Sequence, residues 1–150
     1  MKLQTVRLAE LDDLGVLPAE VAQLEVPVGV LWGSQLCDRV DLNTHVGFVI
    51  FAVIGIFSWL AVDLSSLTVM QFNSVGSSRL VSESTQQFID IMSFVWDRLF
   101  STDLDWSIAI DSILEELIEA GFPEDLVRDG YWQELFWEIR LGDIARDSVE

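Results

Sequence analysis

The chain has 150 residues, a net charge of −17 and a single cysteine, and 51% of its residues are hydrophobic. This length allows one domain, or one membrane-spanning segment with modest flanks. The acidity excludes nucleic acid as a partner, because DNA- and RNA-binding proteins need a basic surface that displaces phosphate counterions. A lone cysteine, Cys37, excludes an internal disulfide and a thiolate metal cluster.

The charged residues are strongly unbalanced, with 25 acids against 8 bases, and Lys2 is the single lysine. Excess acid with scarce lysine is typical of proteins from extreme halophiles. At molar salt the Debye length is about 3 Å, so the carboxylates repel one another little. The pattern therefore predicts a halophilic protein, with an acidic mesophilic protein as the alternative.

The first 40 residues alternate irregularly between apolar and polar side chains. Pro27, Gly29 and Gly33 interrupt a β-branched stretch that would otherwise favour a strand. We expect an extended or mixed N-terminal arm over residues 1–40 that covers another surface.

The segment from Leu42 to Val62 contains no charged residue. As a helix, residues 46–62 would be about 25 Å long, close to the thickness of the hydrocarbon core of a bilayer. The sequence therefore predicts one long apolar helix over 41–72 with a single membrane span at 46–62. Arg39 and Arg79 flank the span equally and leave its orientation open. The apolar side chains of the predicted span include Val46, Phe48, Ile50, Ile54, Phe57, Trp59 and Val62.

A Ser/Gly-rich stretch predicts a linker over residues 73–83. Ser84 and Gln87 have the spacing of a capping box and predict a helix that runs to about Phe100. Most of the circumference of that helix is apolar, so it must be packed on two sides or lie at a membrane interface.

The remaining residues predict three further helices in an acidic helical domain over 84–150. Asp103 or Asp105 caps the first, which ends at Gly121. A short helix follows from Pro123, and the last runs from about Tyr131 to Arg146. Helical spacing predicts two buried stripes: Trp106, Ala109, Ile110, Ile113, Leu114 and Leu117, then Trp132, Leu135, Phe136 and Ile139.

No motif in the chain indicates catalysis or metal binding. Asp103, Asp105 and Asp111 resemble a calcium loop only superficially, because positions six and twelve hold Ile108 and Leu114 instead of glycine and glutamate. The lone histidine, His45, precedes the apolar segment, and Asp63 ends it. We therefore predict no enzymatic activity, no cofactor and no bound metal.

The fold expected from these patterns is mainly α: one long apolar helix, with the length of a membrane span, followed by a small helical bundle. The corresponding function is that of a single-pass membrane structural or accessory protein in a larger assembly, such as a halophile membrane complex or a membrane-containing halophilic virion. The alternative is a soluble acidic helical interaction module in which 46–62 is the central core helix. Expected partners are the lipid bilayer and other protein subunits, in a homo- or hetero-oligomer. Candidate partner contacts are Trp32, Phe94, Trp96, Trp132, Phe136 and Trp137.

Overall fold

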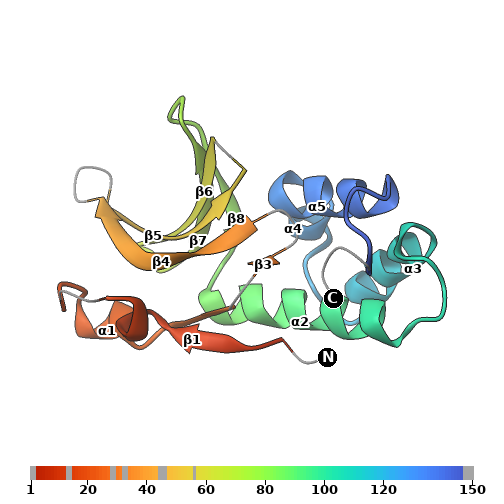
Figure 1. Cartoon of the computed structure of the whole chain (residues 1–150), viewed down its shortest axis with the longest axis horizontal. Coiled ribbons are helices and arrows are strands. Elements are labelled where there is room, and N and C mark those ends of the chain that lie inside the picture. The colour runs from red at the N-terminus through yellow and green to blue at the C-terminus, as the bar shows by residue number, and fades with distance from the viewer. Residues whose placement is uncertain are drawn as a thin grey trace. The chain divides into compact units, whose positions relative to one another are not determined.

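The computed structural model in Figure 1 describes residues 3–12, 15–27, 30–31, 34–43, 47–55 and 57–146, with the backbone alone for 30–31 and 34–43. The chain divides into two compact units. Residues 4–89, here called the sheet unit, contain the strands. Residues 90–150 together with residues 1–3, here called the helical unit, contain most of the helices. The predicted mainly α fold is therefore wrong, because the protein is a mixed α/β protein with two antiparallel sheets.

The sheet unit begins with a small two-stranded sheet. Strand β1 (Thr5–Arg7) pairs with β2 (Glu25–Pro27), and Val6 lies opposite Val26. A short 3-10 helix, η1 (Leu8–Leu11), and one turn of helix, α1 (Ala19–Ala22), connect the two strands. Leu8, Val21 and Val26 are fully or almost fully buried and give this part a local core.

A six-stranded antiparallel meander follows, in which each strand pairs with the next along the chain. Short hairpin connections produce this order, because consecutive antiparallel strands need only a tight turn between them. The strands are β3 (Val30–Leu31), β4 (Ser34–Asn43), β5 (Phe48–Ile54), β6 (Ser58–Asp63), β7 (Val69–Asn73) and β8 (Ser78–Ser82).

The predicted long helix over 41–72 does not form, and the segment is instead divided among strands. Residues 48–54 and 58–63 make the β5–β6 hairpin, in which Val53 lies opposite Trp59. Gly55 in the turn has φ +58° and Gly47 before β5 has φ +70°, a backbone conformation that glycine adopts without steric cost. β-Branched and aromatic side chains dominate the segment, and they favour strands.

The predictions of a membrane span and of a single-pass membrane location are wrong. In the part of the chain that the structure describes, no helix is both long and apolar enough to cross a bilayer. The lack of charge in β5 and most of β6 has a different cause, because both faces of these strands carry apolar side chains and leave no polar alternation.

The predicted linker at 73–83 forms the β7–β8 turn and strand β8. Asn73 Oδ1 accepts hydrogen bonds from the backbone N–H groups of Val75 (3.2 Å) and Ser77 (3.1 Å), and Gly76 has φ +88°. An asparagine that bonds its own following backbone is a turn signal. The Ser/Gly composition thus encodes a hairpin, and the division between the units falls later, between residues 89 and 90.

Helix α2 (Thr85–Ser101) confirms the predicted helix at 84–100, and it crosses the boundary between the units. Ser84 Oγ accepts a hydrogen bond from the N–H of Gln87 (3.0 Å), as the capping box predicts. The reciprocal bond is shifted by one residue, because Gln87 Oε1 accepts from the N–H of Glu83 (2.7 Å).

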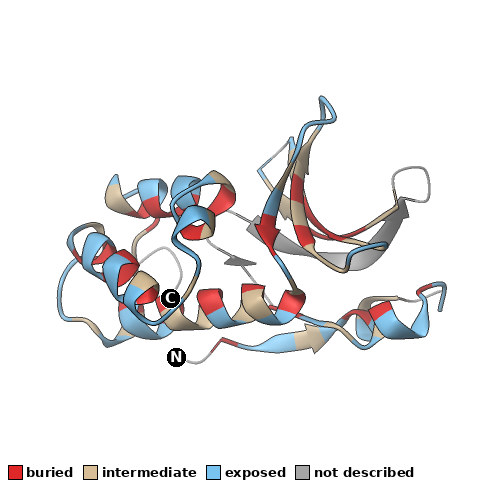
Figure 2. Ribbon diagram, turned by 180° about the vertical axis from the view of Figure 1, so that it is seen from behind, coloured by how far each residue is buried: buried red, intermediate tan, exposed pale blue. Residues whose placement is uncertain are grey.

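The helical unit continues with α3 (Trp106–Glu119), α4 (Glu124–Val127) and α5 (Gly130–Arg140). Figure 2 shows the buried residues along one side of these helices. Both predicted stripes are confirmed, since all ten of their members are buried. Asp105 occupies the N-cap position of α3 but its side chain makes no capping bond, and α5 ends at Arg140, six residues earlier than expected.

Candidate interaction surfaces

The register of strands β5 to β8 assigns their side chains to two faces of the sheet. One face, here called the covered face, carries Val49, Leu60, Val62 and Val69, all with no exposed surface. A bulge places Phe51 and Ala52 together opposite Leu60, and the ring of Phe51 meets Phe88 of α2 edge-on at 6.3 Å between centroids. The start of α2 therefore covers this face.

The opposite face, here called the open face, is also apolar but is not covered to the same extent. Its centre is small and buried, with Ala61 at 0% and Ile50 at 9% exposure. None of the six large apolar side chains around that centre is buried, and Leu80 is 43% exposed. These six side chains are Phe48, Val53, Trp59, Met70, Phe72 and Leu80.

An aromatic cluster shows that the sheet bends toward the open face. Phe48 and Phe72 lie two strands apart and four residues apart in register, a separation of about 16 Å in a flat sheet. Their rings nevertheless stack with centroids 5.1 Å apart, and Trp59 contacts Phe72 at 5.6 Å. The bulges at Phe51 and Val81 supply curvature, and Figure 1 shows the bent strands. The open face is thus a concave apolar surface.

The two charged side chains on these four strands, Asp63 and Arg79, both make hydrogen bonds within the strands and turns. Asp63 ends β6, and its Oδ1 accepts hydrogen bonds from the backbone and hydroxyl of Ser65 (2.8 and 2.6 Å). The hydroxyl of Ser65 contributes most to holding the pKa of Asp63 below its usual value. On the covered face, Arg79 Nε donates to Gln71 Oε1 (2.8 Å), its cross-strand neighbour. One acid and one base are the complete charge of β5 to β8.

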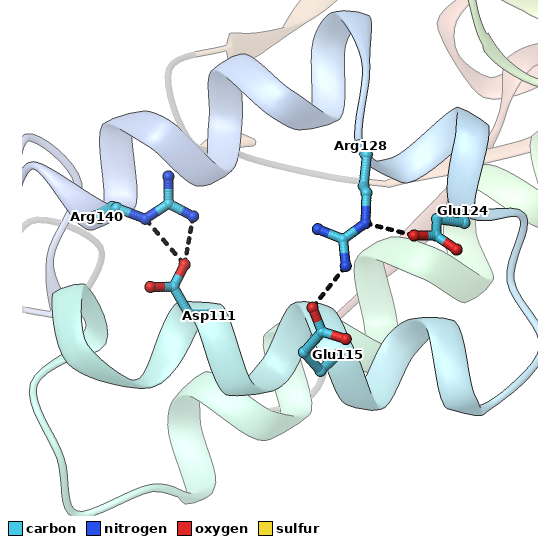
Figure 3. A network of polar contacts seen from close by, with 5 residues as sticks. All are labelled: Asp111, Glu115, Glu124, Arg128 and Arg140. Carbon is cyan, nitrogen blue, oxygen red and sulfur yellow. Dashed lines mark hydrogen bonds and ion pairs between the residues drawn. The ribbon is translucent and has the colours of Figure 1, made fainter.

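The helical unit has a second apolar surface, here called the helical patch. It consists of four exposed side chains: Leu104 (57%), Ile108 (63%), Trp137 (53%) and Leu141 (57%). Asp111 and Arg140 bond across the gap between α3 and α5, as Figure 3 shows. Ile108 lies one turn before Asp111 and Trp137 one turn before Arg140, so in this antiparallel helix pair the ion pair lies between the two exposed side chains.

Ion pairs fix the antiparallel arrangement of α3 and α5 beneath this patch. Arg128, at the end of α4, bonds Glu115 of α3 (2.5 Å) and Glu124 (2.9 Å), at the opposite end from Asp111 and Arg140. The hydrogen bonds to Glu115, and then to Glu124, raise the pKa of Arg128. The order of the pairs brings the start of α3 beside the end of α5, so Ile108 and Leu141 lie at the same end.

Carboxylates surround the helical patch. Burial contributes most to raising the pKa of Glu138 above its usual value, and the charges of Asp143 and Glu134 add to it. The two nearby arginines are engaged, Arg140 with Asp111 and Arg146 with the carbonyl oxygens of Leu99 and Thr102 (3.0 and 3.2 Å). The acids on and beside the patch are Asp103, Asp105, Asp111, Glu134, Glu138 and Asp143.

No metal centre is assembled among the residues that the structure describes. Glu115 bonds Arg128, and Asp111 bonds Arg140. A surface depression of about 240 Å³ between residues 103–107 and 142–146 brings together Asp103, Asp105 and Arg146, and no histidine or cysteine. Its chemistry is that of a solvated surface.

The structure separates the predicted partner contacts by exposure. Trp132 (0%), Phe136 (2%) and Trp96 (7%) are buried. Phe94 is half-buried against Phe122 and beneath Arg98. Trp137 is the exposed member, and Trp32 lies outside the described residues.

The side chains of the predicted span are likewise divided. Ile50 and Val62 are buried, Phe48, Ile54 and Trp59 are half-buried, Phe57 is 65% exposed in the β5–β6 turn, and Val46 lies outside the described residues, as does His45. Sequence reasoning missed Ile108. Its position on the polar side of α3, beside Asp111 and Ser112, was the available signal.

Comparison of the chain with protein-family models, with curated proteins and with solved structures finds no match.

Proposed function

We propose that this protein is a non-enzymatic subunit of a protein assembly and that its open face binds an uncharged apolar segment of another chain. The observation that carries the proposal is the open face itself. Six large apolar side chains surround its centre and none is buried, whereas Val49, Leu60, Val62 and Val69 on the opposite face have no exposed surface. Exposed contiguous apolar surface of this kind marks interaction sites.

Charge and shape support this choice of occupant. The chain carries a net charge of −17, yet β5 to β8 carry one acid and one base. Apart from Asp63, which lies opposite Phe48 at the end of β6, the face offers a charged partner nothing to pair with, and burying an unpaired charge against it would be costly. The face is concave, so it favours a convex occupant such as a helix or a protruding hairpin. Aromatic side chains like those of Trp59 and Phe72 are enriched at the energetic centres of interfaces.

The test is the molar mass of the tagged protein, purified from its native cells at molar KCl and measured by light scattering. We expect a particle larger than the 16.9 kDa chain. Trp59→Thr keeps a strand-forming residue, and it should weaken the assembly about 30-fold, because loss of a central interface tryptophan costs about 2 kcal/mol or more. Trp137→Gln, on the helical patch, is the matched control and should leave the assembly through the open face intact.

Leu80→Gln is a second open-face variant in case Trp59→Thr perturbs folding, because Leu80 is 43% exposed. The recombinant chain alone distinguishes a second copy from a different protein as the occupant. A 16.9 kDa monomer from native cells, with circular dichroism showing a folded chain, would contradict the proposal. So would an assembly that both open-face variants leave unchanged.

A further inference from the structure

Two neighbouring turns at one end of the sheet carry exposed apolar side chains. Phe57, in the β5–β6 turn, is 65% exposed, and Val75, in the β7–β8 turn, is 82% exposed. The backbone N–H of Ser74 donates to the carbonyl oxygen of Phe57 (2.9 Å), so the two turns lie side by side, at the top of Figure 1. Phe57, Ser74 and Val75 are here called the hairpin tip.

The hairpin tip is apolar at positions where turns usually carry glycine, proline or small polar residues. One exposed apolar side chain on a surface is ordinary, but two at adjoining turns make a protruding apolar feature. Residues 54–58 and 73–77 include no charged side chain. Asn73 Oδ1 holds the second turn in shape through the N–H groups of Val75 and Ser77. Binding through the tip therefore requires little further ordering of this turn.

The hairpin tip and the open face are complementary in shape and in chemistry. The tip is convex, apolar and uncharged, and the open face is concave, apolar and almost uncharged. The exposure of Phe57 and Val75 shows that the open face of the same chain does not cover them. We propose that the hairpin tip of one copy of this protein binds in the open face of a second copy, head to tail. This inference rests on the proposed function of the open face and names its occupant.

The distribution of charge favours a second copy as the occupant. Each chain carries a net charge of −17, so two copies repel each other over most of their surfaces. Strands β5 to β8 carry one acid and one base, and a contact between the tip and the open face brings these neutral regions together. Because the contact joins two different surfaces, each copy can contact two others, which gives a ring or a filament.

The first test is the molar mass of the recombinant full chain, measured by light scattering over a range of protein concentrations at molar KCl, where circular dichroism shows a folded chain. We expect a mass above 16.9 kDa that rises with protein concentration. The double tip variant, Phe57→Ser with Val75→Ser, should weaken association about tenfold or more, because it removes the apolar contact and keeps residues suited to turns. Ile108→Ser is the matched control, since Ile108 is 63% exposed but lies on α3, and it should leave association unchanged.

Mixing two variants distinguishes head-to-tail contact from contact between two open faces. Leu80→Gln damages the open face and leaves the tip intact, because Leu80 lies opposite Met70 and away from the turns. The double tip variant has the reverse defect. Each alone should associate more weakly than the wild type, and an equimolar mixture should form a complex of two chains. A mixture that associates no better than the separate variants would overturn the proposal.

The same variants purified from native cells separate this inference from the proposed function. If the open-face variants reduce the particle mass and the double tip variant does not, the open face binds a different protein. The proposed function then stands and this inference is wrong. A folded recombinant wild type that stays at 16.9 kDa at every concentration would also overturn the inference. Reduced particle mass in the tip and open-face variants alike would support it.

Discussion

The region from Gly47 to Ser82 and the region from Asp90 to Arg146 both bury apolar side chains, but they differ in the number of charged residues that they carry. The first contains one acid and one base, and the second contains fourteen acids and four arginines. The first region has no net charge. It forms β5 to β8, and one of its two apolar faces is covered by the start of α2. The acidic region forms amphipathic helices with their acids turned outward. The acidity of this protein is therefore a property of its helices and not of its sheet.

This difference teaches what each surface can bind. An apolar surface without charge selects partners by shape and area, and salt does not weaken that contact. An apolar surface ringed by carboxylates selects partners by charge as well, and salt weakens the contact. The effect of salt concentration on binding therefore distinguishes the two kinds of surface.

The largest expected effect is a loss in the free energy of unfolding when a buried core side chain is truncated. Trp132 is fully buried against Tyr131 and Phe136, so Trp132→Ala should lower the free energy of unfolding by about 3–5 kcal/mol, a large part of the stability of a typical domain. Trp137→Ala, the exposed control, should lower it by less than about 1 kcal/mol. Urea unfolding at molar KCl measures both. Similar losses for the two variants would mean that the exposure of Trp137 is misassigned.

The second comparison is between one truncation on the covered face of the sheet and one on its open face. Leu60 has no exposed surface, and Leu60→Ala should cost about 2–5 kcal/mol. Leu80→Ala, at 43% initial exposure, should cost less than about 1 kcal/mol in the isolated chain. If Leu80→Ala proves as costly as Leu60→Ala, the open face is covered and cannot be an interface.

The turn after β6 gives a smaller effect with a defined pH dependence. The pKa of Asp63 is lowered by its bonds to Ser65 and Ser66, so the charged form stabilises the fold. This contribution is present above the pKa of Asp63 in the unfolded chain and is lost as the pH falls through the lower pKa of the folded chain. Asp63→Asn should therefore reduce stability at neutral pH by roughly 1 kcal/mol or less. The two proteins should converge in melting temperature as the pH falls through the pKa of Asp63 in the folded chain, and a constant difference would exclude this cause.

The smallest effect has the opposite sign. The pKa of Glu138 is raised, so the folded chain holds this proton more tightly than the unfolded chain. The charged carboxylate then costs stability once the pH exceeds the unfolded pKa, and the full cost is reached above the folded pKa. Glu138→Gln should raise the melting temperature slightly at pH 7 and leave it unchanged near pH 3. A lower melting temperature at pH 7 would contradict the proposed repulsion from Glu134 and Asp143.

The helical unit could be predicted from the sequence because its side chains carry a period. Trp106, Ile110 and Ile113 recur at helical spacing among acids, and Ser84 and Gly121 mark the beginning and the end of helices. Such signals are local, and the structure confirms them. The patch itself was harder to predict, because Ile108 and Leu141 are brought to one end by the antiparallel packing of α3 and α5, which the sequence does not state.

The sheet could not be predicted because a buried period-two pattern disappears when both faces are apolar. Phe48, Val49 and Ile50 alternate between the open and covered faces, yet all three are hydrophobic. Length and absence of charge then favoured one membrane helix. The contrary signals were Gly47 and Gly55, which bound a stretch of seven residues rich in valine and isoleucine, the usual length of a buried strand. These glycines have positive φ and separate the strands.

The central claim, that negative charge is concentrated in the helices while strands β5 to β8 are neutral, is tested most directly by hydrogen–deuterium exchange of the whole chain as KCl is lowered from 3 to 0.1 M. Repulsion among the acids of residues 90–146 is screened at high salt and grows as the Debye length lengthens. The account predicts that backbone amides of α3 and α5 lose protection first, while those of β5, β6 and β7 keep theirs to lower salt. Simultaneous loss in both regions, or earlier loss in the sheet, would contradict it.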